Sequence, residues 1–370
     1  MANYKYAIEF AILIFPLIAF LMTLPYMIVQ YFKYGSIPFL RTLIVYSFVL
    51  YLITAYFMVI LPLPSIDYVL QLNTPLVQLI PFRFIGDLIM ESKFVISDFS
   101  TYLVALKQPV FYVNIFNIIL TVPFGVYLRY YFKRKWWEVL IFTFLLSLFF
   151  EITQFTGLYG IYPRPYRLFD IDDLILNSAG GMLGYLLTPL FLFLFPSKEK
   201  VDEIAYERGK KVSFSRRCVA YLIDCFVYNF FVVIIVLVFN VKFSIELYSL
   251  FFLLYFLINV LLFDRKTIGK KIVKIMIVNQ DGSRAKIYQV FARYILRYII
   301  YFKIYNIINW SRKIQESNEI ISLMSVFLCL FVFLIYLKTF FDILTKKEQY
   351  VYEVLSKTKN ISIINYKNNL

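Results

Sequence analysis

FDIDDLILNSAGGMLGY, the sequence of residues 169–185, is the stretch that best indicates the fold. Three carboxylates, those of Asp170, Asp172 and Asp173, stand at the beginning of a glycine-rich apolar segment. Ionisable groups near membrane depth are costly, and they are therefore candidate functional groups. Gly180 and Gly184 have the spacing of small residues through which two membrane helices approach each other closely.

The whole chain has the composition of a polytopic membrane protein. Of its 370 residues, 61% are hydrophobic, and the mean hydropathy is +0.73. Nine apolar segments approach the length of about 20 residues that crosses the hydrocarbon core. These predicted spans are residues 7–32, 39–61, 110–131, 136–157, 174–195, 218–240, 245–263, 287–309 and 320–341. We therefore predict an all-α polytopic integral membrane protein with about nine transmembrane helices in two modules.

The net charge of +15 narrows the class of partner. Lys and Arg lie mostly in short loops, where they act as cytoplasmic retention signals and contact anionic lipid. No basic stripe with interleaved aromatic residues lies outside the apolar segments, so we expect membrane lipids and no nucleic acid as partners. The chain has no His and three Cys without CxxC spacing, so we expect no metal and no cofactor.

The positive loops also orient the predicted spans. They agree with one another if the N-terminus is outside, the C-terminus is cytoplasmic and residues 287–309 cross the membrane. Because that segment carries three basic residues, it is either an eighth span or a basic interfacial helix. Residues 62–109 are too polar to cross and are interpreted as an interfacial or re-entrant lid. In this orientation the lid and the acidic residues 170–173 share the outer face. We expect a multi-pass protein of the bacterial cell membrane.

Polar residues of the first half are predicted to converge at this outer face. Glu151 and Gln154 share one helix face, and Asp173 and Asn177 share another. One carboxylate could cap a helix, but crowded carboxylates need a compensating cation. The resulting mixed pocket could bind a polar lipid headgroup or a hard cation, or transfer protons. Its expected residues are Arg83, Asn117, Glu151, Gln154, Arg167, Asp170, Asp172, Asp173 and Asn177.

The second half follows a charged cytoplasmic linker predicted at residues 197–211. Asp224 lies inside an apolar span, seven residues after Arg217, so both occupy one helix face. Asp224 could pair with Arg293 or Arg297 as a structural ion pair, or it could belong to an ion path.

Two short segments of the second half are predicted to be strands. Lys274–Val278 is rich in β-branched residues and precedes a turn signal, and Asn360–Asn365 alternates near the C-terminus. An isolated strand leaves its backbone groups unpaired. We therefore predict that the two segments pair into a small hairpin-like sheet on the cytoplasmic side, and that it is the only β-structure in the chain.

The first half, residues 1–196, resembles the VanZ-like family. The matching motifs are LIPF at 79–82, NIFN at 114–117, VPFG at 122–125, EITQ at 151–154 and the segment 167–185. The resemblance implies a membrane domain. The namesake of the family is associated with low-level resistance to the glycopeptide teicoplanin.

The second half, residues 212–366, resembles an RDD domain. RCVAYLID at 217–224 fits the opening motif of that family, with Arg217 and Asp224, and KTIGKK at 266–271 fits the central one, with Gly269. The closing motif usually has His and Asp before a Thr, whereas this chain has Tyr352 and Glu353 before Thr358. Involvement in ion transport has been proposed for some RDD domains.

Three functions follow as alternatives. The first is a cell-envelope protein whose outer pocket binds a polar lipid or a cell-wall-related ligand, such as a cell-wall precursor lipid or a glycopeptide, and influences glycopeptide susceptibility. The second is secondary transport of cations or protons through the second half. The third is a carboxylate-dependent membrane enzyme. The sequence shows no nucleophile paired with a base, which argues against this third function.

Overall fold

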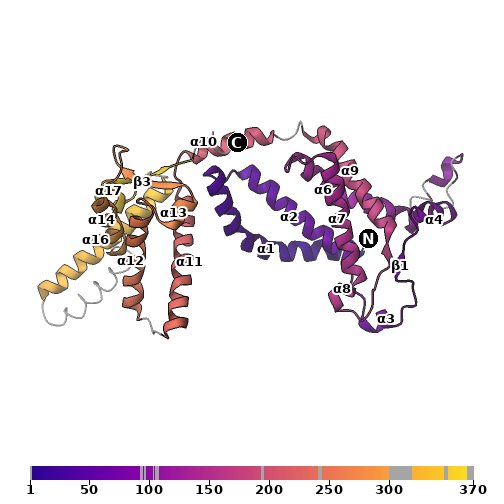
Figure 1. The fold of residues 1–370 in the computed structure, drawn as a ribbon, viewed down its shortest axis with the longest axis horizontal. Helices are drawn as coiled ribbons and strands as arrows, with labels where there is room; N and C mark the ends of the chain where they lie inside the picture. Colours follow the sequence, from indigo (N-terminus) through magenta and orange to yellow (C-terminus); the bar gives the residue numbers. More distant parts are fainter. Residues whose placement is uncertain are drawn as a thin grey trace. The chain divides into compact units, whose positions relative to one another are not determined.

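The computed structural model describes residues 2–91, 95, 97–102, 104, 108–192, 196–240, 244–299, 319–345 and 349–364. The described residues are mostly helical, as Figure 1 shows, and form two compact units. The first unit comprises Met1–Phe20 and Phe39–Val201. The second unit comprises Leu21–Pro38 and Asp202–Leu370.

Six described helices are long and apolar enough to cross a membrane. They cover Lys5–Tyr34, Phe39–Ile60, Pro109–Tyr130, Trp136–Phe155, Phe214–Phe239 and Ile245–Leu262. Helices also occupy two further predicted spans, at Ile171–Leu192 and Glu319–Leu344. The predicted fold class, a helical polytopic membrane protein with a small sheet, is confirmed.

The first unit is built from long helices joined by short ones. Helix α1 (Ala2–Tyr34) begins in this unit and ends in the second. The other long helices are α2 (Phe39–Ile60), α6 (Pro109–Tyr130), α7 (Trp136–Phe155) and α9 (Ile171–Leu192). Between them lie α3 (Ile66–Leu70), α4 (Arg83–Glu91), the 3-10 turn η1 (Phe99–Thr101) and α8 (Gly157–Gly160). The described helices within residues 62–109 are too short to cross a membrane.

Glycines let α9 pack backbone to backbone against its neighbours. A side-chain carbon added at Gly180 would meet the carbonyl oxygen of Ile118 in α6, and one at Gly184 would meet that of Val122. A carbon at Gly181 would meet Thr143 of α7. The close helix contact predicted from the glycine spacing is therefore present, and it joins α6, α7 and α9 (Figure 1).

A second, very short sheet corrects the prediction of a single one. Strands β1 (Val77–Gln78) and β2 (Phe169–Asp170) are parallel, with Val77 opposite Phe169. The pairing joins the region predicted as a lid to the residue that precedes α9. Two residues are too few for any alternating pattern, so sequence periodicity gave no signal for this sheet.

The second unit contains shorter helices around one apolar core. Its elements are α10 (Lys198–Gly209), which begins in the first unit, α11 (Phe214–Phe239), α12 (Ile245–Leu262), α13 (Ile268–Ile272), α14 (Ile287–Tyr298), α16 (Glu319–Leu344) and α17 (Val351–Leu355). Aromatic residues of three helices, Tyr228, Phe252, Phe256 and Tyr294, pack with Ile277 in the main cluster.

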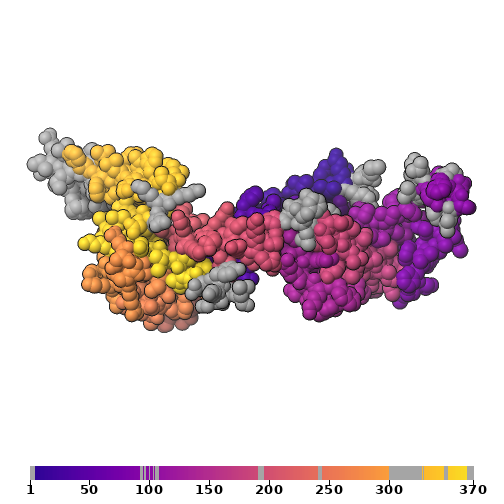
Figure 2. Space-filling model, turned by 90° about the horizontal axis from the view of Figure 1, so that it is seen from above, coloured from indigo at the N-terminus to yellow at the C-terminus, as the bar shows by residue number. Residues whose placement is uncertain are grey.

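The predicted pairing of the two strand segments in this unit is confirmed. Strand β3 (Ile275–Asn279) runs antiparallel to β4 (Thr358–Ser362), with Ile275 opposite Ser362 and Asn279 opposite Thr358. The strands are about 80 residues apart, so the sheet is not a hairpin. In Figure 2 the yellow C-terminal residues lie against the orange residues of this unit, as the contacts of α14 with α17 and β4 require.

Residues 287–309 were predicted either to span the membrane or to lie at its surface. The described part is α14, which has 12 residues and buries Val290, Arg293 and Tyr294. A helix of this length does not cross the hydrocarbon core by itself. Residues 300–309 of the predicted segment lie outside the described residues.

Candidate functional site

A cavity of about 810 Å³ in the first unit contains six of the nine residues predicted for the pocket. Its polar lining consists of Asn117, Glu151, Gln154, Arg167, Asp173 and Asn177. Its apolar lining comes mainly from the end of α2 and the first three turns of α6, and it includes Met58, Val59, Tyr112, Phe116 and Leu120. The cavity therefore combines two carboxylates and three side-chain amides with an apolar wall.

Asp173 is the centre of the polar lining. The Asn117 side chain donates a hydrogen bond of 2.5 Å to its carboxylate, and the Ser147 hydroxyl donates to its backbone carbonyl over 3.3 Å. Asn177 donates in turn to the Ser147 hydroxyl over 2.8 Å. The Oδ1 atom of Asn177 is buried and has no hydrogen-bond partner among the described residues. A buried acceptor without a donor is costly, and a ligand donor would relieve that cost.

Glu151 and Gln154 lie on the buried face of α7, as their spacing predicts. The Glu151 carboxylate accepts a hydrogen bond of 3.0 Å from the backbone N–H of Asp170. The Gln154 amide donates to the backbone carbonyl of Val59 over 2.9 Å. Glu151 is only 3% exposed, yet it has no cationic partner within 4.0 Å among the described residues.

The other two Asp residues act mainly on backbone groups. Asp170 accepts from the N–H of Asp172 over 2.8 Å and so caps α9, as predicted for one carboxylate. Asp172 accepts from the N–H groups of Phe82 and Phe84, at 2.6 and 2.9 Å, at the start of α4. Burial and the nearby negative charge of Asp172 raise the pKa of the Asp170 carboxyl. These contacts fasten the short helix α4 to α9.

The two predicted cations lie beside the carboxylates, but among the described residues neither forms an ion pair with the cluster within 4.0 Å. Arg83 lies with Asp170, Asp172 and Asp173 around a neighbouring cavity of about 500 Å³, and its own ion pair is with Asp87, at 3.7 Å. Arg167 is exposed at the larger cavity and makes no ion pair within 4.0 Å with the described residues. Asp173 lines both cavities, so the predicted residues do form one continuous neighbourhood.

The second unit holds a buried ion cluster around Glu353, which is fully buried. Arg217 donates to both carboxylate oxygens, at 3.1 and 3.0 Å, and Arg293 forms a second ion pair. The Asn360 amide donates to the same carboxylate over 2.7 Å. The cluster thus links α11, α14, α17 and β4.

Asp224 does not pair with Arg293 or Arg297, which corrects that prediction. Its carboxylate accepts from the Thr267 hydroxyl at 2.6 Å, from the N–H of Gly269 at 2.8 Å and from the Tyr255 hydroxyl at 3.2 Å. It therefore holds the start of α13 against α11. Gly269 is required there because a side-chain carbon would meet the carbonyl oxygen of Ala220.

Comparison with known families assigns both halves of the chain. The VanZ/LLP1 family matches residues 48–194, and the RDD family matches residues 211–349. The chain joins a VanZ-like domain to an RDD domain. No curated protein and no solved structure matched. We refer below to the first unit as the VanZ-like unit and to the second as the RDD unit.

The RDD match ends at residue 349, before Glu353. The structure nevertheless places Glu353 against Arg217 of the opening motif. Glu353 stands at the position where the closing motif was expected to have Asp. Glu is one methylene longer than Asp, and here it reaches both guanidinium groups.

Several residues of the two sites gave no usable signal in the sequence. In the RDD unit, Arg216 is fully buried and donates to three backbone carbonyls and to Ser362. It was not predicted as a site residue because the adjacent Arg217 is the arginine that fits the opening motif. In the VanZ-like unit, Ser147 and Gln78, which donates to the Asp170 carboxylate over 3.4 Å, have no pattern that distinguishes them from other polar residues. The helical spacing of Arg216, Val219 and Ile223 does mark the buried face of α11.

Proposed function

We propose that the VanZ-like unit binds a membrane amphiphile whose headgroup carries hydroxyl or amino donors, as cell-wall precursor lipids do. The observation that supports this most strongly is the cavity of about 810 Å³. Its size falls within the range of roughly 300–1,000 Å³ that is usual for small-molecule sites. Carboxylates and the unpartnered Asn177 oxygen offer acceptors to such a headgroup, and the apolar wall offers a surface to its chain.

The carboxylates of this lining retain acceptor capacity for a ligand. Glu151 receives one backbone hydrogen bond, and Asp173 receives one side-chain hydrogen bond, so each carboxylate retains acceptor capacity. An amino or hydroxyl group placed between them would be held by charge-assisted hydrogen bonds, which are stronger than neutral ones. Arg167, at the rim, suits an acidic part of the same headgroup.

We also propose that this cavity opens toward the outer face, with the N-terminus outside and the C-terminus in the cytoplasm. The positive loops support this orientation. In a background without the native cysteines, a cysteine at Leu168 should react with a membrane-impermeant thiol reagent in intact cells. A cysteine at Ser197 should react only after lysis. The reverse labelling pattern would contradict the orientation.

The proposed consequence is an effect on glycopeptide susceptibility, which a complementation series tests. A deletion strain would receive the native chain, Glu151→Gln, Asp173→Asn or the control Asp67→Asn, whose carboxylate is exposed on α3 of the same unit. Teicoplanin susceptibility should return to the native value only with the native chain and the control. Membrane levels of each protein would be matched by immunoblot. If Glu151→Gln and Asp173→Asn restored susceptibility as fully as the native chain does, the cavity would be ruled out as the functional site.

A further inference from the structure

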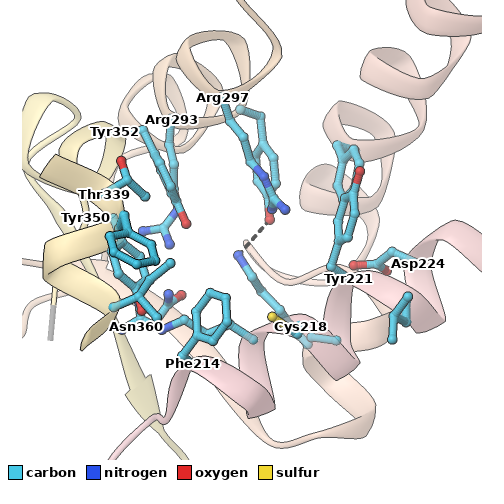
Figure 3. Close-up of a pocket in the computed structure, with 18 of the residues that line it drawn as sticks. Phe214, Cys218, Tyr221, Asp224, Arg293, Arg297, Thr339, Tyr350, Tyr352 and Asn360 are labelled. Atoms are coloured by element: carbon cyan, nitrogen blue, oxygen red, sulfur yellow. Dashed lines mark hydrogen bonds between the residues drawn. The ribbon is translucent and has the colours of Figure 1, made fainter. Parts of the chain in front are cut away.

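The RDD unit contains a further cavity, of about 540 Å³, which four basic side chains line. It lies between α11, α13, α14, α16 and the C-terminal segment. Figure 3 shows Arg293 and Arg297 extending from α14 into this space, toward Phe214 and Cys218 of α11. Arg217 and Lys270 complete the set of basic side chains in the wall.

Basic side chains outnumber carboxylates among the described residues that line this cavity. Four basic side chains line it, whereas the described acidic groups beside it are the carboxylates of Asp224, in the lining, and Glu353, which pairs with Arg217 and Arg293. Both carboxylates are already engaged, Glu353 by two guanidinium groups and Asp224 by hydroxyl and backbone donors.

Positive charges that line one cavity repel one another, and an anion inside it would interact favourably with all of them. Lys270 is the lining residue on which this repulsion acts most clearly. Burial, together with the positive charges of Arg293 and Arg297, lowers the pKa of its ammonium group well below the usual range. Its Nζ donates to the Tyr294 hydroxyl over 2.8 Å.

Aromatic rings hold the guanidinium groups in place without cancelling their charge. Arg297 lies over the Tyr221 ring, 4.4 Å from its centre, and Arg217 lies over the Tyr350 ring at 4.7 Å. Arg293 is fixed by Glu353 and by the Thr358 hydroxyl at 2.9 Å. Planar guanidinium groups that are held in advance match the oxygens of a phosphate, which they bind through paired hydrogen bonds.

We propose that the cavity of the RDD unit binds a phosphate group, supplied by a lipid headgroup or by a soluble phosphate. The rest of the wall favours the lipid as its source. Leu222, Phe256, Phe340 and Ile343 form an apolar side that suits acyl chains. A cation path through the same space would have to pass four positive side chains, which opposes the transport of cations through it.

The test is calorimetric titration of the purified full-length chain in non-ionic detergent. The probes are dihexanoyl phosphatidic acid, dihexanoylglycerol, which lacks the phosphate, and inorganic phosphate. The native chain should bind the phosphatidic acid and not the glyceride. Inorganic phosphate should bind at least about tenfold more weakly if a lipid is the source, and equally well if a soluble phosphate is.

Variants separate the cavity from the general positive charge of the chain. Arg297→Gln should weaken phosphatidic acid binding by about tenfold or more, since a charged hydrogen bond is lost. The control Lys211→Gln removes an exposed cation of the same unit and should bind as the native chain does. Should Arg297→Gln fail to fold, Arg297→Lys keeps the charge without the planar fork and should bind with intermediate affinity. Absence of binding by the native chain, or equal binding by Arg297→Gln and Lys211→Gln, would overturn the proposal.

Discussion

Glu151 in the VanZ-like unit and Glu353 in the RDD unit are both almost completely buried, but their partners differ in kind. Glu151 accepts from one backbone N–H and faces a cavity. Glu353 is enclosed by two guanidinium groups and an amide. A carboxylate with spare acceptor capacity beside a cavity suits ligand binding, whereas one that neutralises two buried cations suits a structural role. The comparison therefore predicts opposite consequences for similar substitutions.

The largest loss of stability is expected when β4, the strand that contributes Asn360 to the Glu353 cluster, is removed. A chain ending at Thr358 loses most of β4, including the Asn360 bond to Glu353 and the Ser362 bond to Arg216. The RDD unit should then become sensitive to protease while fragments of the VanZ-like unit stay resistant. A chain ending at Ile364 keeps β4 and is the control. Undiminished protease resistance of the shorter chain would show that β4 is dispensable.

Glu353→Gln should lower the stability of the RDD unit by about 3–5 kcal/mol, the usual cost of removing one partner from a buried ion cluster. The substitution removes the negative charge that pairs with both Arg217 and Arg293. Thermal unfolding in detergent measures the change, and Glu207→Gln, at an exposed pair with Lys210, is the control. A midpoint equal to that of the control would contradict the structural role of Glu353.

Gly184→Val tests the packing of the VanZ-like unit, with an expected loss of about 1–3 kcal/mol. The added carbons would collide with the Val122 carbonyl oxygen, and backbone cannot move aside as a flexible side chain can. Gly86→Ala in α4, where an added carbon meets nothing within 4 Å, should change stability by less than about 1 kcal/mol. Comparable unfolding midpoints for the two variants would refute the close contact of α6 and α9.

Glu151→Gln should have the smallest effect on folding and sharpens the comparison with Glu353→Gln. The amide oxygen of Gln can still accept the hydrogen bond from the Asp170 N–H. The stability of the chain should therefore change by no more than about 1 kcal/mol. Thermal unfolding of the two Glu→Gln variants side by side measures the difference. A loss as large as that of Glu353→Gln would mean that Glu151 is also structural.

The sequence predicted the features that depend on composition and local pattern. Apolar length gave the spans, glycine spacing gave the contact of α9 with α6, and alternation gave the pairing of β3 with β4. These signals are local because each depends on residues within one element. Segments of one or two residues carry no such signal, which is why the pair β1 and β2 was missed.

Partners of buried charges were harder to predict, because complementary charge does not define distance. Asp224 and Arg293 have opposite charges and lie on predicted spans, yet each binds a different partner. Asp224 satisfies donors at the start of α13, and Arg293 pairs with a residue from the C-terminal segment. Arg216 likewise differs from its neighbour Arg217 in its orientation on α11, and only the helical spacing from Arg216 to Val219 and Ile223 indicates which of the two is buried.

The division of α1 between the two units limits how freely the halves of this chain can be exchanged. Its last turns and the loop that follows carry Tyr31, whose hydroxyl bonds to that of Ser215 at 2.7 Å, and Ser36, which donates to the Ala205 carbonyl. Tyr31 also packs against Val219 and Val273 in the RDD unit. An RDD half excised at the linker would leave behind this N-terminal piece of its own core. Recombination at the apparent boundary would therefore yield a damaged RDD unit, so the fused gene is expected to evolve as one inherited piece.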